Sequence, residues 1–317
     1  MPSIEEAPPA QAMAAAGTAH RIVVDPVWGY RRLDPLPSGG DLDAFYESQY
    51  RDLLDAGGRA PDLARLVGGG PEAEREREWQ AATIHADVLA ALEEGVAEGA
   101  PRRVLDVGCG TGDLLRTLAS AGWEAIGTEP ASEIAEMGRA SGLHIEVATA
   151  ADYLAAWQRS GAAKFGGIVL LNVLEHVLDP ASLLLSLAPA LAPGGRLVVR
   201  VPNDFNPLQT AARSMLGGDP WWIAAPDHVN YFDHASIGAL VERAGFEVVH
   251  RSADFPMELF LLMGDDYRTD PALGHDVHER RRRAEMALET TTRRALGQAW
   301  AAAGVGRNAL VIARWPG

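Results

Sequence analysis

One stretch of the sequence combines an acidic side chain with glycines at a regular spacing, and this combination predicts a ligand site. Asp106 is followed at alternate positions by Gly108, Gly110 and Gly112. Glycine accepts a positive φ and allows a ligand to lie against bare backbone. A dinucleotide fingerprint has its last glycine at the sixth position, where this chain carries Asp113. The carboxylate of Asp106 disfavours a pyrophosphate, so the stretch favours a cationic ligand.

The flanking residues indicate which elements hold this turn. An apolar run, 103–107, precedes the glycines and an amphipathic run, 113–121, follows them, which is the pattern of a strand and a helix in a doubly wound α/β sheet. The stretch 104–115 resembles motif I of class I S-adenosylmethionine (SAM)-dependent methyltransferases. The resemblance implies SAM as the cofactor, with Asp106 near the amino group of its methionine. The residues that it implies beneath the ligand are Gly108, Cys109, Gly110 and Gly112.

The fold implied by the resemblance is α/β: a Rossmann-like seven-stranded class I methyltransferase sheet with an N-terminal helical cap and a helical insertion before the last strand. The segments expected as strands are 103–107, 125–129, 144–147, 167–171, 196–201, 246–251 and 309–314. The last two form an antiparallel hairpin in this fold. Their connection, 252–308, is too long for a plain loop, so it predicts inserted helices.

Four regions are therefore expected. They are a flexible N-terminal arm at 1–40, a helical cap at 41–98, the SAM-binding domain at 99–254 plus 304–317, and the helical insertion at 255–303. Within the insertion, the basic run 280–283 is flanked by glutamates, and we interpret it as the solvated face of a helix. The cap carries three aromatic residues at helical spacing that are candidates for substrate contact, with core packing as the alternative: Tyr46, Tyr50 and Trp79.

Composition and charge exclude several classes of partner. The 317 residues carry a formal net charge of −15, which opposes binding to the phosphate backbone of a nucleic acid. The single cysteine, Cys109, permits no intramolecular disulfide. No apolar run has the length of a membrane span, and the first residues do not read as a signal peptide. We therefore expect a cytoplasmic enzyme that acts without nucleic acid or membrane. The oligomeric state stays open, with a homodimer as one option.

Further cofactor contacts are expected at the ends of later strands. Glu129 lies 23 residues after Asp106, the spacing at which a βαβ unit presents a carboxylate to ribose hydroxyls. Pro130 then begins the next turn. The resemblance implies adenine contacts at Ala151 and Asp152, although Asp152 is equally interpreted as the N-cap of the following helix. It also implies that Asn172 and Val173 border the SAM methionine.

Methyl transfer requires a group that removes the acceptor's proton. His228 is our first candidate, because a histidine followed by x-x-Tyr-Phe resembles a segment of sugar C-methyltransferases in which the histidine is a base, and imidazole titrates near neutral pH. The alternative is a histidine that only binds loop backbone. His176 is the second candidate, with helix packing as its alternative, and Tyr231 completes the catalytic set. Two further residues are assigned to substrate binding: Asn203 and Trp222.

The sequence thus predicts a SAM-dependent methyltransferase that acts on O, C or N of a small molecule, such as a sugar, a nucleotide-sugar or a natural-product intermediate. No metal is assigned. The alternative is a metal-assisted O-methyltransferase that uses Glu175, His176 and His228. Some relatives of the fold carry Glu-x-x-Glu-His where this chain has Asn172, Glu175 and His176. An amide is a poorer ligand than a carboxylate for a hard cation. A non-catalytic SAM-binding protein and a nicotinamide oxidoreductase remain as further readings.

Overall fold

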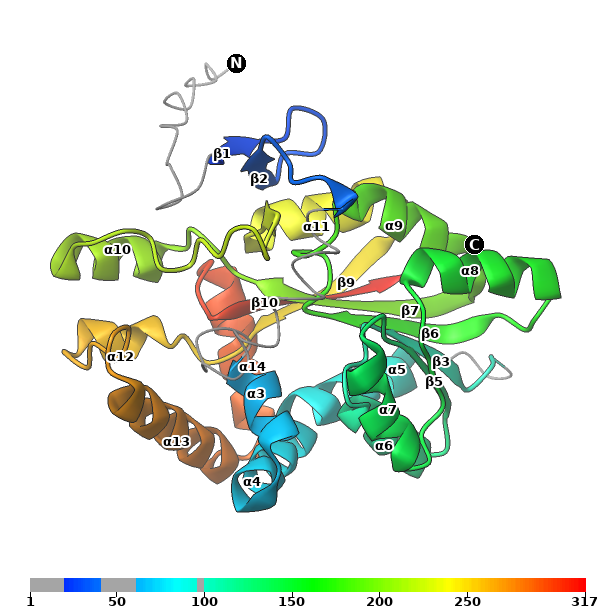
Figure 1. Ribbon diagram of the computed structural model, residues 1–317, viewed down its shortest axis with the longest axis horizontal. Coiled ribbons are helices and arrows are strands. Elements are labelled where there is room, and N and C mark those ends of the chain that lie inside the picture. Colours follow the sequence, from blue (N-terminus) through cyan, green and yellow to red (C-terminus); the bar gives the residue numbers. More distant parts are fainter. Residues whose placement is uncertain (1–19, 41–60, 96–99) are drawn as a thin grey trace.

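The computed structural model describes residues 20–40, 61–95 and 100–317. A seven-stranded sheet runs through the middle of the molecule, with helices on both faces (Figure 1). Its strands, in spatial order, are β5 (Ile145–Glu146), β4 (Glu124–Thr128), β3 (Arg103–Val107), β6 (Phe165–Leu171), β7 (Leu191–Pro202), β10 (Asn308–Arg314) and β9 (Glu247–Ala253). Only β10 runs antiparallel to its neighbours, β7 and β9. All seven strands predicted from the sequence are present.

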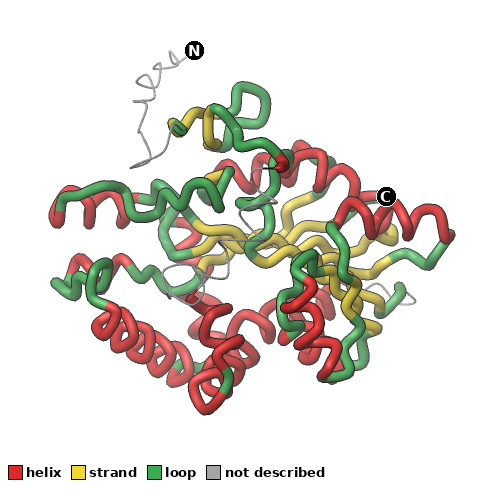
Figure 2. Tube along the Cα trace, in the orientation of Figure 1, coloured by secondary structure: helices red, strands yellow, loops and turns green. Residues whose placement is uncertain are grey.

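Continuous apolar runs form the central strands because both faces of a parallel sheet are covered. The helices that follow the strands are α6 (Asp113–Ser120), α7 (Ser132–Ala140), α8 (Ala150–Ser160), α9 (Pro180–Leu187), α10 (Pro207–Leu216) and α11 (His234–Arg243). In Figure 2, helices lie above and below the strands. Leu105 and Ile168 pack on the face covered by α9 and α11, whereas Val104 and Val169 pack on the opposite face.

The strand predicted at 196–201 is longer than expected. β7 already begins at Leu191, so it includes the Pro-Gly-Gly run 193–195. The pairing of β6 with β7 shifts register between Phe165 and Gly167, and this irregularity accommodates the run within the strand.

The N-terminal segment is not the flexible arm that we predicted, at least from residue 20 onward. β1 (Arg21–Val24) and β2 (Arg31–Asp34) form an antiparallel hairpin, and β2 pairs with β8 (Asn230–Tyr231). Prolines suggested an irregular arm, but Pro26 lies in the turn and Pro35 follows β2. The fully buried Leu33 anchors the hairpin in a cluster with Val229 and Tyr231.

The described part of the cap is helical: α3 (Pro61–Gly68), α4 (Gly70–Gln80), a π-helical turn (Ala81–His85) and α5 (Ala86–Gly95). The loop expected at 57–71 is therefore wrong where α3 forms, with Pro61 at its first position. Tyr46 and Tyr50 lie outside the described residues. Trp79 is buried, and its Nε1 donates a hydrogen bond to Glu285 at 3.0 Å. Core packing, the alternative reading of Trp79, is what the structure supports.

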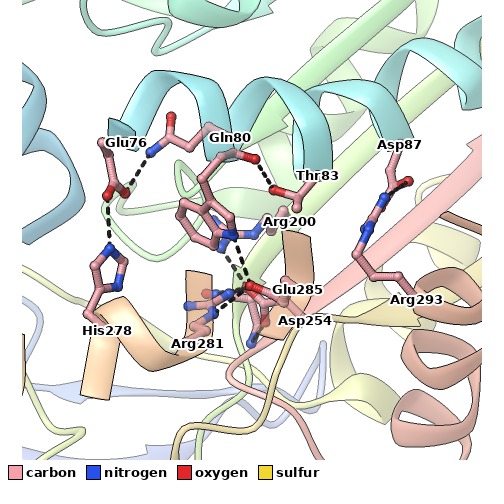
Figure 3. A network of polar contacts seen from close by, with 12 residues as sticks. Glu76, Gln80, Thr83, Asp87, Arg200, Asp254, His278, Arg281, Glu285 and Arg293 are labelled. Atoms are coloured by element: carbon pink, nitrogen blue, oxygen red, sulfur yellow. Dashed lines mark hydrogen bonds and ion pairs between the residues drawn. The ribbon is translucent and has the colours of Figure 1, made fainter. Parts of the chain in front are cut away.

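Three helices occupy the long connection between β9 and β10: α12 (Glu258–Leu262), α13 (Pro271–Ala287) and α14 (Thr290–Ala302). The basic run of α13 is not a solvated face throughout, because Arg281 and Arg282 are only 3% and 4% exposed. Arg281 pairs with Glu285 and Arg282 pairs with Glu76 of α4, each at 3.0 Å. Figure 3 shows a further contact between these helices, in which His278 of α13 lies 2.8 Å from the carboxylate of Glu76 of α4. None of the described helices has the length and apolar character needed to span a membrane.

The docked hairpin yields a prediction. Leu33→Ala should lower the free energy of unfolding by about 2–5 kcal/mol, because it leaves a cavity in a buried cluster. Val24→Ala is the matched control, since Val24 lies in the same hairpin but is 49% exposed, and it should change stability by less than about 0.5 kcal/mol. Urea unfolding measures both. Equal and small effects would mean that the hairpin is not packed on the fold.

Candidate cofactor and active site

The turn after β3 is rich in glycine because its backbone is left-handed at alternate residues. The φ angle is 69° at Gly108, 55° at Gly110 and 80° at Gly112, a region that other residues rarely adopt. A Cβ on Gly108 would lie 2.9 Å from Cγ2 of Val173. The turn after β3 and the turn after β6 therefore pack directly against each other.

The same turn is fixed to the end of β4. The backbone N–H groups of Gly108 and Cys109 both donate to the carbonyl of Thr128, at 2.8 and 3.0 Å. A Cβ on Gly127 would lie 2.4 Å from Sγ of Cys109, so the thiol fills the space that this glycine leaves. Burial raises the pKa of Cys109. The thiol is therefore a packing group rather than a nucleophile.

Two carboxyl groups meet at the ends of β3 and β4. Asp106 is 3% exposed, and burial together with the charge of Glu129 raises the pKa of Asp106 to about 8. Among the described residues no basic side chain forms an ion pair with Asp106. Glu129 accepts hydrogen bonds from the N–H groups of Gly110 (3.1 Å) and Ala131 (2.9 Å). Burial nevertheless raises the pKa of Glu129. A cationic ligand would relieve this concentration of buried acid.

The segment expected to contact adenine is a helix start. Thr149 is the N-cap of α8, and its Oγ1 accepts from the backbone N–H of Asp152 at 3.1 Å while donating to the Asp152 carboxylate at 2.7 Å. The interpretation of Asp152 as the N-cap is therefore wrong by three residues. Ala151 and Asp152 are both exposed, and their contact with adenine stays a prediction.

Asn172 connects the end of β6 to β7. Its φ of 58° lies in the left-handed region, which asparagine tolerates better than most residues. Its backbone N–H donates to the carbonyl of Arg200 at 2.8 Å. Its side-chain oxygen accepts from the guanidinium of Arg200, and its Nδ2 donates to Glu175 Oε1 at 2.9 Å. Our sequence reasoning missed Arg200, because nothing local distinguishes it from other charged strand residues.

The segment 227–231 is hydrogen-bonded to the residues that follow β6. The N–H groups of Val229 and Asn230 donate to the carbonyl of Glu175 at 2.8 and 3.1 Å. The side chain of Asn230 donates to the carbonyls of Leu174 (2.9 Å) and Val177 (2.6 Å). β2 holds the same segment from its other side. These bonds bring His228 next to His176.

The two candidate histidines form an edge-to-face pair with ring centroids 4.8 Å apart. His176 Nδ1 lies 3.1 Å from Oδ1 of the buried Asp227, and Glu175 lies 4.0 Å from His176 Nε2. Burial lowers the pKa of His176, but the hydrogen bond to Asp227 and the charges of both acids outweigh burial and raise it to about 9. Sequence reasoning gave Asp227 no role, although it directly precedes His228.

Tyr231 and Trp222 pack beside this pair. The ring of Tyr231 is fully buried, with its centroid 6.4 Å from that of His228. Trp222 is 8% exposed and packs edge-on against Phe205, and its Nε1 has no hydrogen-bond partner among the described residues. Their roles toward an acceptor stay predictions.

Asn203 is a structural connector. It is fully buried, and its Nδ2 donates to the carbonyls of Gly304 (3.2 Å) and Gly306 (3.0 Å). These bonds fasten the end of β7 to the turn before β10. Within the described part of the chain its Oδ1 has no hydrogen-bond partner, so the predicted contact with substrate would involve this oxygen.

Glu175, His176 and His228 also form a group that could hold a metal ion, because one ligand atom from each lies within 4.8 Å of the others. One carboxylate and two imidazoles form a donor set that suits Zn²⁺ or Fe²⁺. The amide of Asn172 is already bonded to Arg200 and Glu175, so it does not supply a fourth ligand.

Comparisons with known proteins agree with this geometry. A profile described as a methyltransferase domain matches residues 73–251, more than half of the chain. Ubiquinone biosynthesis O-methyltransferase from Alkalilimnicola ehrlichii is 34% identical over 104 residues, covering 32% of this chain and 42% of the relative. The enzyme of the same name from Xylella fastidiosa (strain 9a5c) is 38% identical over 103 residues, with the same coverage. The chain thus spans about two fifths of the length of these relatives.

Solved structures with a similar arrangement include a SAM-dependent methyltransferase from Archaeoglobus fulgidus, with a TM-score of 0.47, 17% identity, and coverage of 73% of this chain and 94% of that one. Magnesium protoporphyrin IX methyltransferase from Synechocystis PCC 6803 with bound S-adenosylhomocysteine (SAH) has a TM-score of 0.47 and 17% identity, and covers 68% and 92%.

The strand order with one antiparallel strand, together with the acidic residues at the ends of β3 and β4, is that of the Rossmann-like class I methyltransferase fold. The chain belongs to the methyltransferase-domain family.

The raised pKa of Asp106 yields a prediction about stability. A carboxyl group whose pKa is higher in the folded state loses stabilisation as the pH rises toward that pKa. Asp106→Asn should therefore stabilise the ligand-free protein at pH 8 by more than about 1 kcal/mol, and by less at pH 5. Urea unfolding at both values measures this. Glu124→Gln on β4 is the control, because Glu124 is exposed. A gain from Asp106→Asn that is equal at both pH values would contradict the assigned burial of charge.

Proposed function

We propose that this methyltransferase transfers the methyl group of SAM to a small-molecule acceptor and that His228 is the general base. The observation that carries the proposal is the clamp between the segments 172–177 and 227–231, which holds His228 beside the turn that packs on Gly108. A sugar, a nucleotide-sugar or a natural-product intermediate is the expected acceptor. Oxygen is the favoured atom, because the curated relatives are named O-methyltransferases.

The residues at the sheet edge fit SAM. Asp106 is a buried carboxyl group without a basic partner in the described residues, which suits the ammonium group of the methionine. Glu129 retains acceptor capacity on both carboxylate oxygens after accepting two backbone N–H groups, which suits a pair of ribose hydroxyls. The glycines expose backbone between them. SAM supplies the activated methyl group; the chain's residues hold it and the acceptor in line, which contributes about 7–11 kcal/mol to lowering the barrier.

Of the two histidines, His228 is the better base. The hydrogen bond to Asp227 raises the pKa of His176 to about 9, so at neutral pH the His176 ring already carries its proton. A protonated His176 cannot accept a further proton, so we assign that role to His228, whose ring centroid lies 4.8 Å from that of His176. His176 then orients the pair, with its own ring held by Asp227.

The first prediction concerns SAM binding. At pH 7, binding should release close to one proton, because Asp106 has a pKa of about 8 in the free protein and an ammonium partner favours its ionised form. Calorimetric titration in two buffers of different ionisation enthalpy measures the release. Asp106→Asn should abolish it and weaken binding by about tenfold or more, and Glu129→Gln should weaken binding similarly without abolishing proton release. Unchanged affinity in both variants would refute the assigned cofactor contacts.

The second prediction concerns His228. His228→Ala should reduce turnover by about 10²- to 10⁴-fold while SAM binds as in the wild type, because a positioned base affects only the chemical step. The assay is methyl transfer from labelled SAM to a panel of sugars, nucleotide-sugars and catechols, followed by kinetics on the best acceptor. Undiminished turnover would exclude His228 as the base. A wild-type protein that binds SAM but methylates nothing would favour a non-catalytic role.

A second candidate function is metal-assisted O-methylation. The observation that favours it is the cluster of Glu175, His176 and His228, in which Asp227 bonds His176 Nδ1 as a carboxylate typically orients a metal-binding imidazole. Dialysis against EDTA, followed by titration with Mg²⁺ or Zn²⁺, distinguishes the two. Loss of turnover that a metal restores, with SAM binding intact, would favour the second candidate over a metal-free base.

A further inference from the structure

Arg200 of β7 links the segment 172–177, which follows β6, to the inserted helices. Its side chain is 14% exposed. One end of the guanidinium donates to the side-chain oxygen of Asn172, and the other end donates to Asp254 Oδ2 at 2.8 Å. Arg200 is far in the sequence from both partners. Because the guanidinium is planar, it fixes the position of Asn172 relative to Asp254 more rigidly than an ammonium group would.

Asp254 is a fixed anchor for this arginine. It directly follows β9, and it accepts from the backbone N–H of Asn308 at 2.7 Å and from the Asn308 side chain at 2.8 Å. Arg281 of α13 pairs with the same oxygen that binds Arg200, at 3.2 Å. Figure 3 shows Arg200, Asp254 and Arg281 within the polar network between the sheet and α13. The carboxylate is therefore held by groups on two other elements before it orients Arg200.

Asn172 transmits this orientation to the site. Its amide is bonded at both ends, with the oxygen on Arg200 and the nitrogen on Glu175. This holds a non-glycine residue at a φ of 58°, a conformation that costs free energy unless the surroundings determine it. The next residue, Val173, lies against Gly108. A displacement of Asn172 would thus move both the wall of the cofactor site and Glu175.

We propose that Arg200 is a positioning residue of the methyltransferase. Because Asp254 fixes its guanidinium, Arg200 holds Asn172 in its left-handed conformation. Asn172 in turn positions Val173 against the Gly-rich turn and orients the carboxylate of Glu175 toward His176. The inference rests on the proposed assignment of Asn172 and Val173 to the cofactor site. It makes the junction between β9 and the inserted helices a support for SAM binding.

The network contains a matched control. Arg200 and Arg281 donate to the same oxygen of Asp254, and both are largely buried. Arg281 pairs with Glu285 rather than with Asn172. Arg200→Met and Arg281→Met therefore each remove one buried guanidinium from the same carboxylate, but only the first removes the contact with Asn172. General destabilisation of the junction affects both variants.

The experiment is calorimetric titration of wild type and both variants with SAH, with thermal unfolding of each protein as the measure of folding. Arg200→Met should weaken SAH binding by about tenfold, as expected for loss of one charge-assisted hydrogen bond. Arg281→Met should change the affinity by less than about twofold while lowering the unfolding temperature as much as Arg200→Met. Arg200→Lys should restore part of the affinity, because it keeps a donor toward Asn172.

A double-mutant cycle tests the route through Asn172. In the background of Asn172→Ala, Arg200→Met should cause no further loss of affinity, because the two residues act in series. Equal affinities in the two methionine variants, or additive losses in the cycle, would overturn the inference. If Arg200→Met does not fold, Arg200→Lys against Arg281→Lys provides the comparison with a smaller expected loss of affinity for Arg200→Lys, because a lysine keeps only part of the contact with Asn172. Failure of the wild type itself to bind SAH would instead refute the assigned cofactor site.

Discussion

The parallel pairing of β3 with β4 and with β6 is the constraint on which the site depends. Val107 pairs with both Thr128 and Leu170, so the three strands end at one edge of the sheet. Asp106, Glu129 and Asn172 consequently converge although they are widely spaced in the chain. Because the carboxyl ends of such strands border the ligand crevice, the apolar runs that build the core also determine where polar groups can meet.

The convergence of acidic residues at this edge lowers the stability of the ligand-free protein. Asp106 and Glu129 bring two acidic groups together under burial, and the pKa of each is raised. A hydrophobic or amide side chain at position 106 would stabilise the ligand-free protein. The retained acid makes sense as a binding group, because the energy stored in its burial is recovered only when a cation arrives. Asn172 likewise adopts a conformation that costs free energy, a positive φ, and hydrogen bonds at both ends of its side-chain amide stabilise it.

Local sequence patterns predicted much of the fold and of the candidate site. The glycine turn, the acid after β4 and the central strands were predictable, because each depends on residues close together in the chain. Partners distant in sequence were not predictable. Arg282 is buried because Glu72 and Glu76, both on α4, pair with it, whereas the basic run alone resembles a solvated helix face. The hairpin was missed for the same reason, since its burial depends on Val229 and Tyr231.

Segments outside the region that matches the family profile are also joined to the candidate site. The region that matches the family profile ends at residue 251, before the inserted helices, and it begins after the hairpin. These outer segments are nevertheless joined to the site: the hairpin pairs with β8 beside His228, and α13 reaches Asn172 through Asp254 and Arg200. Segments outside the matched region therefore contribute to the geometry of the candidate catalytic residues.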